Sequence, residues 1–109
     1  MVIPNHPFET IDWTVLPKEI HNGVTGFAMW QTMQVGNVRV RMVEYSPDYD
    51  ADHWCSKGHI IFCIEGEMET TLQDGRKYIL YKGMTYHVGD GNEAHRTKSE
   101  AGCKLFIVD

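Results

Sequence analysis

The sequence predicts a single all-β domain, either a sandwich or a small barrel. Short apolar segments are separated by turn signals such as Gly36-Asn37 and Asp74-Gly75, as expected for antiparallel strands joined by tight turns. No segment has a convincing helical period. The chain of 109 residues, 42% hydrophobic and 23% charged, is of ordinary globular composition and long enough for one modest core. No internal repeat or linker divides it.

Residues 1–25 are predicted to form an N-terminal arm, and residues 26–109 the β-barrel domain. The arm is expected to be irregular over residues 1–23, because prolines interrupt any regular element; these are Pro4, Pro7 and Pro17. Its apolar side chains are too numerous for a free tail. We therefore expect the arm to pack on the barrel or on a partner subunit.

The strands expected after the arm follow from alternation and from the turn residues between them. They are 27–35, 38–45, 60–64, 67–72, 76–80, 84–88, 94–99 and 103–108, with loops at 46–51 and 89–92. In the second of these, Arg39 and Arg41 share one face. If they faced a pocket they would suit a carboxylate, whereas on the outer face at least one would be solvated.

The segment Ile60 to Ile64 is apolar at every position. A strand that is apolar on both faces has to be covered on both sides. The arm and a second copy of the chain are the candidates for the outer cover, and we therefore expect a homodimer.

Charge and targeting signals restrict the class of protein. The net charge of -5 at pH 7, without any basic stripe, argues against nucleic-acid binding. No apolar run approaches the ~20 residues that span a bilayer, and the first residues do not resemble a signal peptide. The three cysteines Cys55, Cys63 and Cys103 are an odd number, so we expect reduced thiols and a cytoplasmic protein. From the charge and the apolar runs, we expect no nucleic-acid or membrane partner.

The candidate functional residues are His53, Cys55 and His59, followed much later by His95. Within the first group every spacing is even, so on a strand these side chains would point to one face. Imidazole nitrogen and thiolate sulfur together suit a borderline-soft transition metal. The pattern therefore predicts a metal site built from all four residues. Asp52 would either orient a ligand imidazole from outside the coordination shell or cap the loop.

These residues resemble the first motif of the cupins, G-x5-H-x-H-x3,4-E-x6-G. Here the chain reads His53-x-Cys55-x3-His59-x6-Gly66, which keeps the spacing but replaces the second His by Cys and the Glu by His. The segment Asp52-His53-Trp54-Cys55 also resembles the Asp-His-Cys-Trp grouping after which one group of small uncharacterised cupins is named.

A second cupin motif, P-x-G followed by His, has a counterpart further along the chain. Tyr81-Lys82-Gly83 replaces the proline by Tyr81, and His95 stands where the motif's His is expected. The resemblance covers residues 38–108. It implies a double-stranded β-helix, an RmlC-like jelly-roll barrel with a ligand pocket at one mouth, and a divalent metal (Zn, Ni or Fe) in that pocket.

The coordination by Cys55 decides between two readings of the site. As a ligand beside three histidines it would complete a closed tetrahedral zinc site, which is typical of a structural or sensor module. As a non-ligand it would face the pocket as an oxidisable thiol and leave positions open for water or substrate. A third reading is a metal-free polar network.

The function predicted from the sequence is a metal-binding cupin protein that binds or acts on a small organic molecule. The alternative is a non-catalytic zinc-type module with a closed site of three His and one Cys. The sequence does not decide whether the protein is an enzyme, because one fold supports many reactions as well as binding.

Overall fold

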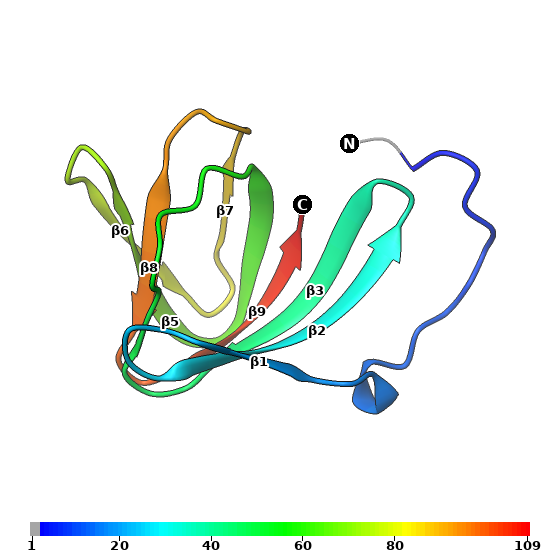
Figure 1. The fold of residues 1–109 in the computed structure, drawn as a ribbon, viewed down its shortest axis with the longest axis horizontal. Coiled ribbons are helices and arrows are strands. Elements are labelled where there is room, and N and C mark those ends of the chain that lie inside the picture. The colour runs from blue at the N-terminus through cyan, green and yellow to red at the C-terminus, as the bar shows by residue number, and fades with distance from the viewer. Residues whose placement is uncertain (1–2) are drawn as a thin grey trace.

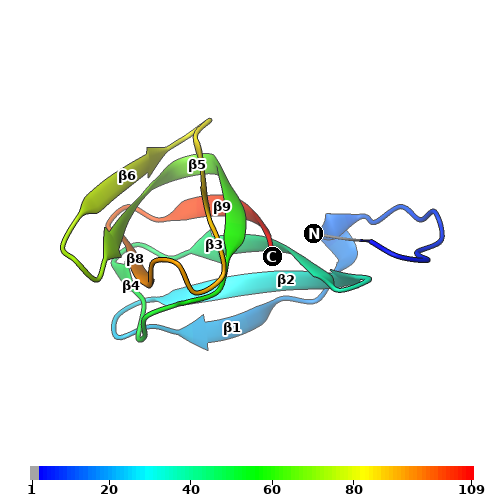
Figure 2. The same ribbon diagram turned by 90° about the horizontal axis from the view of Figure 1, so that it is seen from above.

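Strands account for most of the chain in the computed structural model, which describes residues 3–109. The strands are β1 (Glu19–Asn22), β2 (Phe27–Val35), β3 (Val38–Tyr45), β4 (Tyr49–Asp50), β5 (His59–Leu72), β6 (Lys77–Tyr81), β7 (Thr85–Val88), β8 (His95–Ser99) and β9 (Cys103–Val108), and a 3-10 helix spans Trp13–Val15. The sheet curls on itself into a barrel (Figures 1 and 2). The predicted all-β fold is confirmed.

The long strand β5 closes the barrel because it belongs to both of its walls. The part of β5 before the bend pairs with β9 and β7, and the part after the bend pairs with β6 and β8. The bend lies at Gly66, where the register with β9 shifts after Cys63 and φ is +78°. Figure 2 shows β5 arching over the barrel. Both ends of β5 are thereby brought to the same mouth.

The sequence suggested two strands, 60–64 and 67–72, where the structure has one. The Glu65-Gly66-Glu67 segment resembles a turn, but β5 runs through it without ending. The register with β9 shifts just before it, between Cys63 and Glu65, and such an irregularity bends a strand without ending it. The strands predicted at 27–35 and 38–45 are confirmed at those bounds.

The core lies between the two walls and is built from inward-facing residues of β3, β5 and β9, with Ala28 of β2 and Leu80 of β6. Met68, Leu105 and Cys63 are its largest fully buried side chains. Every second residue of β9 is buried (Cys103, Leu105, Ile107), which is the alternation of a strand with one face on a core. Cys63 and Cys103 are thus core residues, and burial raises the pKa of the Cys103 thiol to about 12.

The arm is more regular than the sequence predicted. Residues 19–22 form β1, which pairs antiparallel with β2, because the proline-free segment after Pro17 can donate to an exposed strand edge. The preceding part contacts the barrel through Gln31, whose amide donates to the carbonyls of Trp13 and Leu16. Residues 1–2 of the predicted arm lie outside the described residues.

The loop predicted at 46–51 also contains a short strand, β4, which pairs with β8. Among residues 3–109, no helix is long and apolar enough to cross a membrane.

Candidate metal centre

Three of the four predicted metal ligands lie together at the mouth of the barrel. The ligand atoms of Cys55, His59 and His95 are all within 4.8 Å of one another. The two imidazoles are closest, with 2.8 Å between their Nε2 atoms. His59 and His95 are 9% and 3% exposed, and Cys55 is half-buried. The sequence-based grouping of these three residues therefore corresponds to a real cluster.

The backbone positions all three residues of the cluster: two of them begin strands, and the third forms a β-bridge with one of these. His59 opens β5 opposite Val88 of β7, and His95 opens β8 opposite Leu72, at the far end of β5. Cys55 exchanges two backbone hydrogen bonds with His95, at 2.8 and 3.0 Å. That bridge fixes the thiol beside the imidazole although Cys55 lies in an otherwise irregular segment.

His53, the fourth predicted ligand, is not part of this cluster. Its side chain is 75% exposed, and its Nδ1 lies 2.6 Å from Oδ1 of Asp52. The expectation that even spacing puts His53 on the ligand face assumed a strand. Residues 51–58 form no strand apart from the single bridge at Cys55, so alternation does not apply there. Coordination by His53 stays a prediction.

The hydrogen bonds of the two imidazoles fit a cation between them. His95 Nδ1 lies 2.9 Å from the carbonyl oxygen of Glu93, which only accepts, so Nδ1 donates and Nε2 of His95 holds a lone pair. His59 has Nε2 against that lone pair and Nδ1 facing a carboxylate oxygen of Asp109 at 3.5 Å. The one proton of a neutral His59 serves only one of these contacts.

Protonating both nitrogens of His59 would satisfy both contacts, but the surroundings oppose it. Burial, together with the neighbouring His95, lowers the pKa of His59 to about 4, so the ring is neutral at neutral pH. A metal ion held by both Nε2 atoms would satisfy the two lone pairs and leave the Nδ1 proton of His59 for Asp109. Two imidazoles and a thiolate are a suitable donor set for zinc and for similar divalent metals.

Asp109 is a buried residue beside the cluster that the sequence did not reveal. Its side chain is 0% exposed and accepts from Arg39 Nε at 2.8 Å and from Arg41 Nη2 at 2.8 Å. Burial acts to raise the pKa of Asp109, but the hydrogen bonds and charges of Arg39 and Arg41 outweigh it and hold that pKa below its usual value. The two arginines thus bind a carboxylate, and it belongs to the chain itself.

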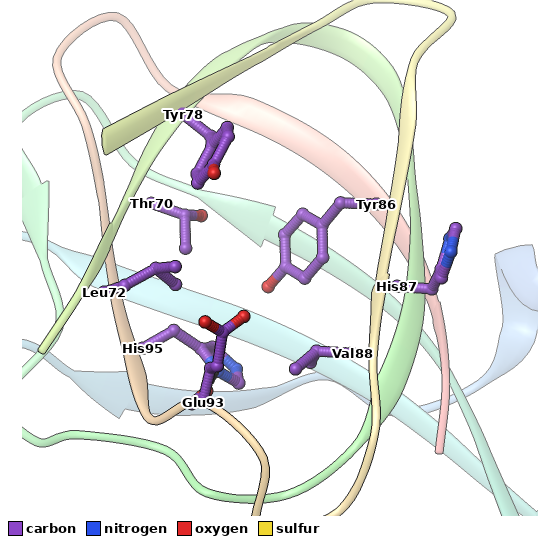
Figure 3. A pocket seen from close by; sticks show the side chains of 8 residues that line it. All are labelled: Thr70, Leu72, Tyr78, Tyr86, His87, Val88, Glu93 and His95. Carbon is purple, nitrogen blue, oxygen red and sulfur yellow. Dashed lines mark hydrogen bonds between the residues drawn. The ribbon is translucent and has the colours of Figure 1, made fainter. Parts of the chain in front are cut away.

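A cavity of about 260 Å³ adjoins the cluster. Its lining residues are Thr70, Leu72, Tyr78, Tyr86, His87, Val88, Glu93 and His95. Figure 3 shows Tyr78 from β6 and Tyr86 from β7 directed into the same space above His95, with the carboxylate of Glu93 at its rim. Arg76 forms an ion pair with Glu93. The volume is below the range of drug-sized pockets, about 300–1,000 Å³, and suits a small metabolite.

Tyr86 connects the cavity to the cluster. Its hydroxyl lies 3.3 Å from Nε2 of His59, and burial raises the pKa of Tyr86 above its ordinary value. The phenol is therefore protonated at neutral pH and can donate to an oxygen atom of a molecule in the cavity. Tyr78 and Tyr86 could have been chosen from the sequence only as aromatic residues near a strand end. Tyr45 lies away from the cavity: it stacks on Tyr49 at 4.3 Å and packs on the core.

His87 has its ring on the opposite side of β7 from the cavity in Figure 3, and its side chain is exposed. The arm histidines His6 and His21 contact Glu9 and Glu19. None of these three belongs to the cluster.

No protein-family model and no curated protein matches this sequence. The structure, by contrast, is similar to solved cupins. It matches a sugar phosphate isomerase from a cupin superfamily of Silicibacter pomeroyi with a TM-score of 0.73 and 12% identity, over 92% of this chain and 74% of that chain. It also matches a cupin-2 domain-containing protein of Shewanella frigidimarina with a TM-score of 0.58 and 15% identity, over 71% and 74% of the two chains.

A third match is ectoine synthase from P. lautus, with a TM-score of 0.64 and 21% identity. The match covers 74% of this chain and 62% of the synthase. Identities this low show a shared fold, and the catalytic features of these proteins do not transfer with it. The likeness was anticipated from the spacing of the histidines and glycines, and it leads to one conclusion: this chain has the cupin fold.

Proposed function

We propose that this protein binds a divalent transition metal through Cys55, His59 and His95 and presents it to a small organic molecule in the adjoining cavity. The observation that carries the proposal is the pair of buried imidazoles whose Nε2 atoms face each other at 2.8 Å, with a thiol beside them. When bound, the metal would polarise an oxygen atom of the ligand as a Lewis acid. Zinc, nickel and iron all accept this donor set.

The residues of the cavity would bind and orient that ligand. Leu72 and Val88 provide apolar walls, and Tyr86 provides a hydroxyl donor close to His59. A ligand with a metal-binding oxygen at one end and an apolar body would satisfy these groups. The names of two matched structures, a synthase and an isomerase, support a small-molecule role without selecting a reaction.

Three protein ligands favour an open site over the closed structural module. A catalytic zinc site typically has three protein ligands and one open position, whereas a structural site has four. His53 would be the fourth ligand of a closed site, and its side chain is 75% exposed and bonded to Asp52. The open site is therefore the form that the geometry supports best.

Cobalt-loaded protein distinguishes the two forms, because the visible spectrum of Co²⁺ reports its ligands. We expect a sulfur-to-cobalt charge-transfer band that is lost in Cys55→Ser, and a spectral change when azide is added and enters the open position. His53→Ala should change neither the spectrum nor, by more than about 3-fold, the affinity, since ordinary surface substitutions have small effects. An azide-insensitive spectrum that becomes sensitive in His53→Ala would instead establish the closed four-ligand site.

We also propose that the protein is a cytoplasmic homodimer. The three thiols are free, which supports a reducing compartment. On the outer face of the sheet, Ile60 and Phe62 are 48% and 40% exposed, and they pair across strands with Val108 and Phe106. This apolar surface supports a second copy as its cover.

Sedimentation equilibrium tests the dimer directly. We expect a mass of twice 12.5 kDa for the wild type, and the monomer mass for Phe62→Lys, in which a charge replaces an apolar contact. Lys57→Ala, at an exposed position, is the control and should leave the dimer intact. A wild type that sediments as a monomer would remove the proposal.

A further inference from the structure

A network of charged side chains connects Arg39 and Arg41 to His59, one of the three residues of the candidate metal site. Asp109 is its centre: the carboxylate is 0% exposed and lies between two guanidinium groups and one imidazole. Arg39 binds it through Nε at 2.8 Å and Nη2 at 3.1 Å, and Arg41 through Nη2 at 2.8 Å. A carboxylate is buried in this way only when charged partners compensate its desolvation.

The two arginines fix where this carboxylate lies. Arg39 donates one hydrogen bond to each carboxylate oxygen atom, a bidentate geometry that fixes the orientation of the carboxylate. Arg41 adds a third hydrogen bond, and its guanidinium lies 4.3 Å from the centre of the Trp30 ring, a cation–π contact that also holds it in place. The oxygen Oδ2 is thereby held on the side of the ring of His59 that faces away from His95.

His59 connects this network to the proposed metal site. Its Nδ1 is buried and has no hydrogen-bond partner among the described residues, and Oδ2 of Asp109, at 3.5 Å, is the acceptor that faces it. A buried imidazole nitrogen without a partner is costly. The contact is slightly longer than an ordinary hydrogen bond of about 2.7–3.2 Å.

We propose that Asp109 is a positioning residue: it holds the proton of His59 on Nδ1 and so directs the Nε2 lone pair of His59 toward the metal. The inference rests on the proposed function and extends it beyond the three ligands. A carboxylate behind a histidine ligand fixes its tautomer and its ring orientation and raises its basicity. Here the same carboxylate also separates the two guanidinium charges from a bound divalent cation.

Substitution of Asp109 would remove both effects. Without the carboxylate, Arg39 and Arg41 would face the imidazole with no counter-charge, and the His59 proton would be free to move to Nε2 and donate to His95. Because outer-sphere partners of this kind are worth about 10–100-fold in metal affinity, we expect Asp109→Asn to weaken Zn²⁺ binding by about that factor. The three ligands themselves are unchanged in this variant.

Two control variants separate positioning from general stability. Arg39→Gln removes two of the hydrogen bonds of Asp109 but keeps the carboxylate behind His59. We expect it to lower the thermal stability and to weaken Zn²⁺ binding clearly less than Asp109→Asn does, because Arg41 still binds the carboxylate. Glu65→Gln removes one exposed carboxylate that pairs with Lys104 at 3.7 Å, and it controls for the change in net charge.

The decisive readouts are Zn²⁺ affinity by competition with a chelating dye and the tautomer of His59 by ¹⁵N NMR of the zinc-loaded wild type. We expect a protonated, hydrogen-bonded Nδ1 and a zinc-coordinated Nε2. The NMR measurement needs no variant, so it decides the question even if Asp109→Asn does not fold. Coordination through Nδ1, or an equal loss of affinity in Asp109→Asn and Arg39→Gln, would overturn the positioning role.

The same titrations separate this inference from the proposed function. A wild type that takes up no metal would overturn the proposed function and this inference together. A wild type that binds Zn²⁺ as tightly as Asp109→Asn would overturn the role of Asp109 alone. The expected result is tight binding by the wild type, a loss in Asp109→Asn and wild-type affinity in Glu65→Gln.

Discussion

Replacing His59 or His95 by Ala is expected to lower the affinity for Zn²⁺ by at least about 100-fold. Each substitution deletes one of two imidazoles whose Nε2 atoms are 2.8 Å apart. Partners that only support a ligand are already worth about 10–100-fold, so losing a ligand itself should cost more. Isothermal titration with Zn²⁺ and with Ni²⁺ measures the effect.

The relative effects of the ligands carry further information. We expect His59→Ala to weaken binding at least as much as Cys55→Ser, because His59 occupies the position of the Glu in the cupin motif. His87→Ala is the matched control, since His87 lies on β7 with its ring away from the cavity. Unchanged metal content in His59→Ala would remove the claim that this histidine replaces the glutamate.

The second large effect is expected on stability. Gly66→Ala should lower the free energy of unfolding by about 4 kcal/mol, because two penalties add. The residue has φ of +78°, and a Cβ atom would lie 2.4 Å from the backbone oxygen of Gly102. Neither β5 nor the neighbouring turn can yield without opening the bend that joins the two walls. In a domain of this size such a loss lowers Tm by about 20 °C.

Gly75→Ala separates the two penalties. Gly75 also has a positive φ, +96°, but a Cβ there meets nothing within 4 Å. We expect this control to cost only about 1–2 kcal/mol, the price of the left-handed conformation alone. Thermal denaturation followed by circular dichroism compares the two variants. Equal losses would show that the close approach at Gly66 contributes nothing.

Local patterns predicted most of the fold because they encode its strands directly. The hairpin of β2 and β3 follows from alternation on both sides of Gly36-Asn37, and both strands begin and end where alternation placed them. The bend of β5 was mistaken for a turn, since a Gly with positive φ serves in turns as well as in bends of a strand. The strand β1 was missed because its pairing with β2 is a tertiary contact that its own four residues do not signal.

The sequence predicted the site residues that lie on strands, because spacing is informative only where the backbone is regular. The cupin-like spacing identified His59 and His95. His59 begins β5, and His95 of β8 pairs with Leu72 at the other end of β5. The two histidines meet only because β5 bends. Spacing failed for His53, since the segment around it is not a strand. Asp109 gave no signal at all: Arg39 and Arg41 lie 70 and 68 residues away in sequence, and their ion pairs depend on the antiparallel pairing of β3 with β9.

The most direct test of a metal centre at Cys55, His59 and His95 is a crystal structure of the Zn²⁺-loaded protein with anomalous data at the zinc edge. We predict one strong peak bonded to Sγ of Cys55 and to Nε2 of His59 and of His95, with a water molecule or a small ligand on the side of the cavity. A peak elsewhere on the chain, or no peak after loading, would contradict the proposed centre.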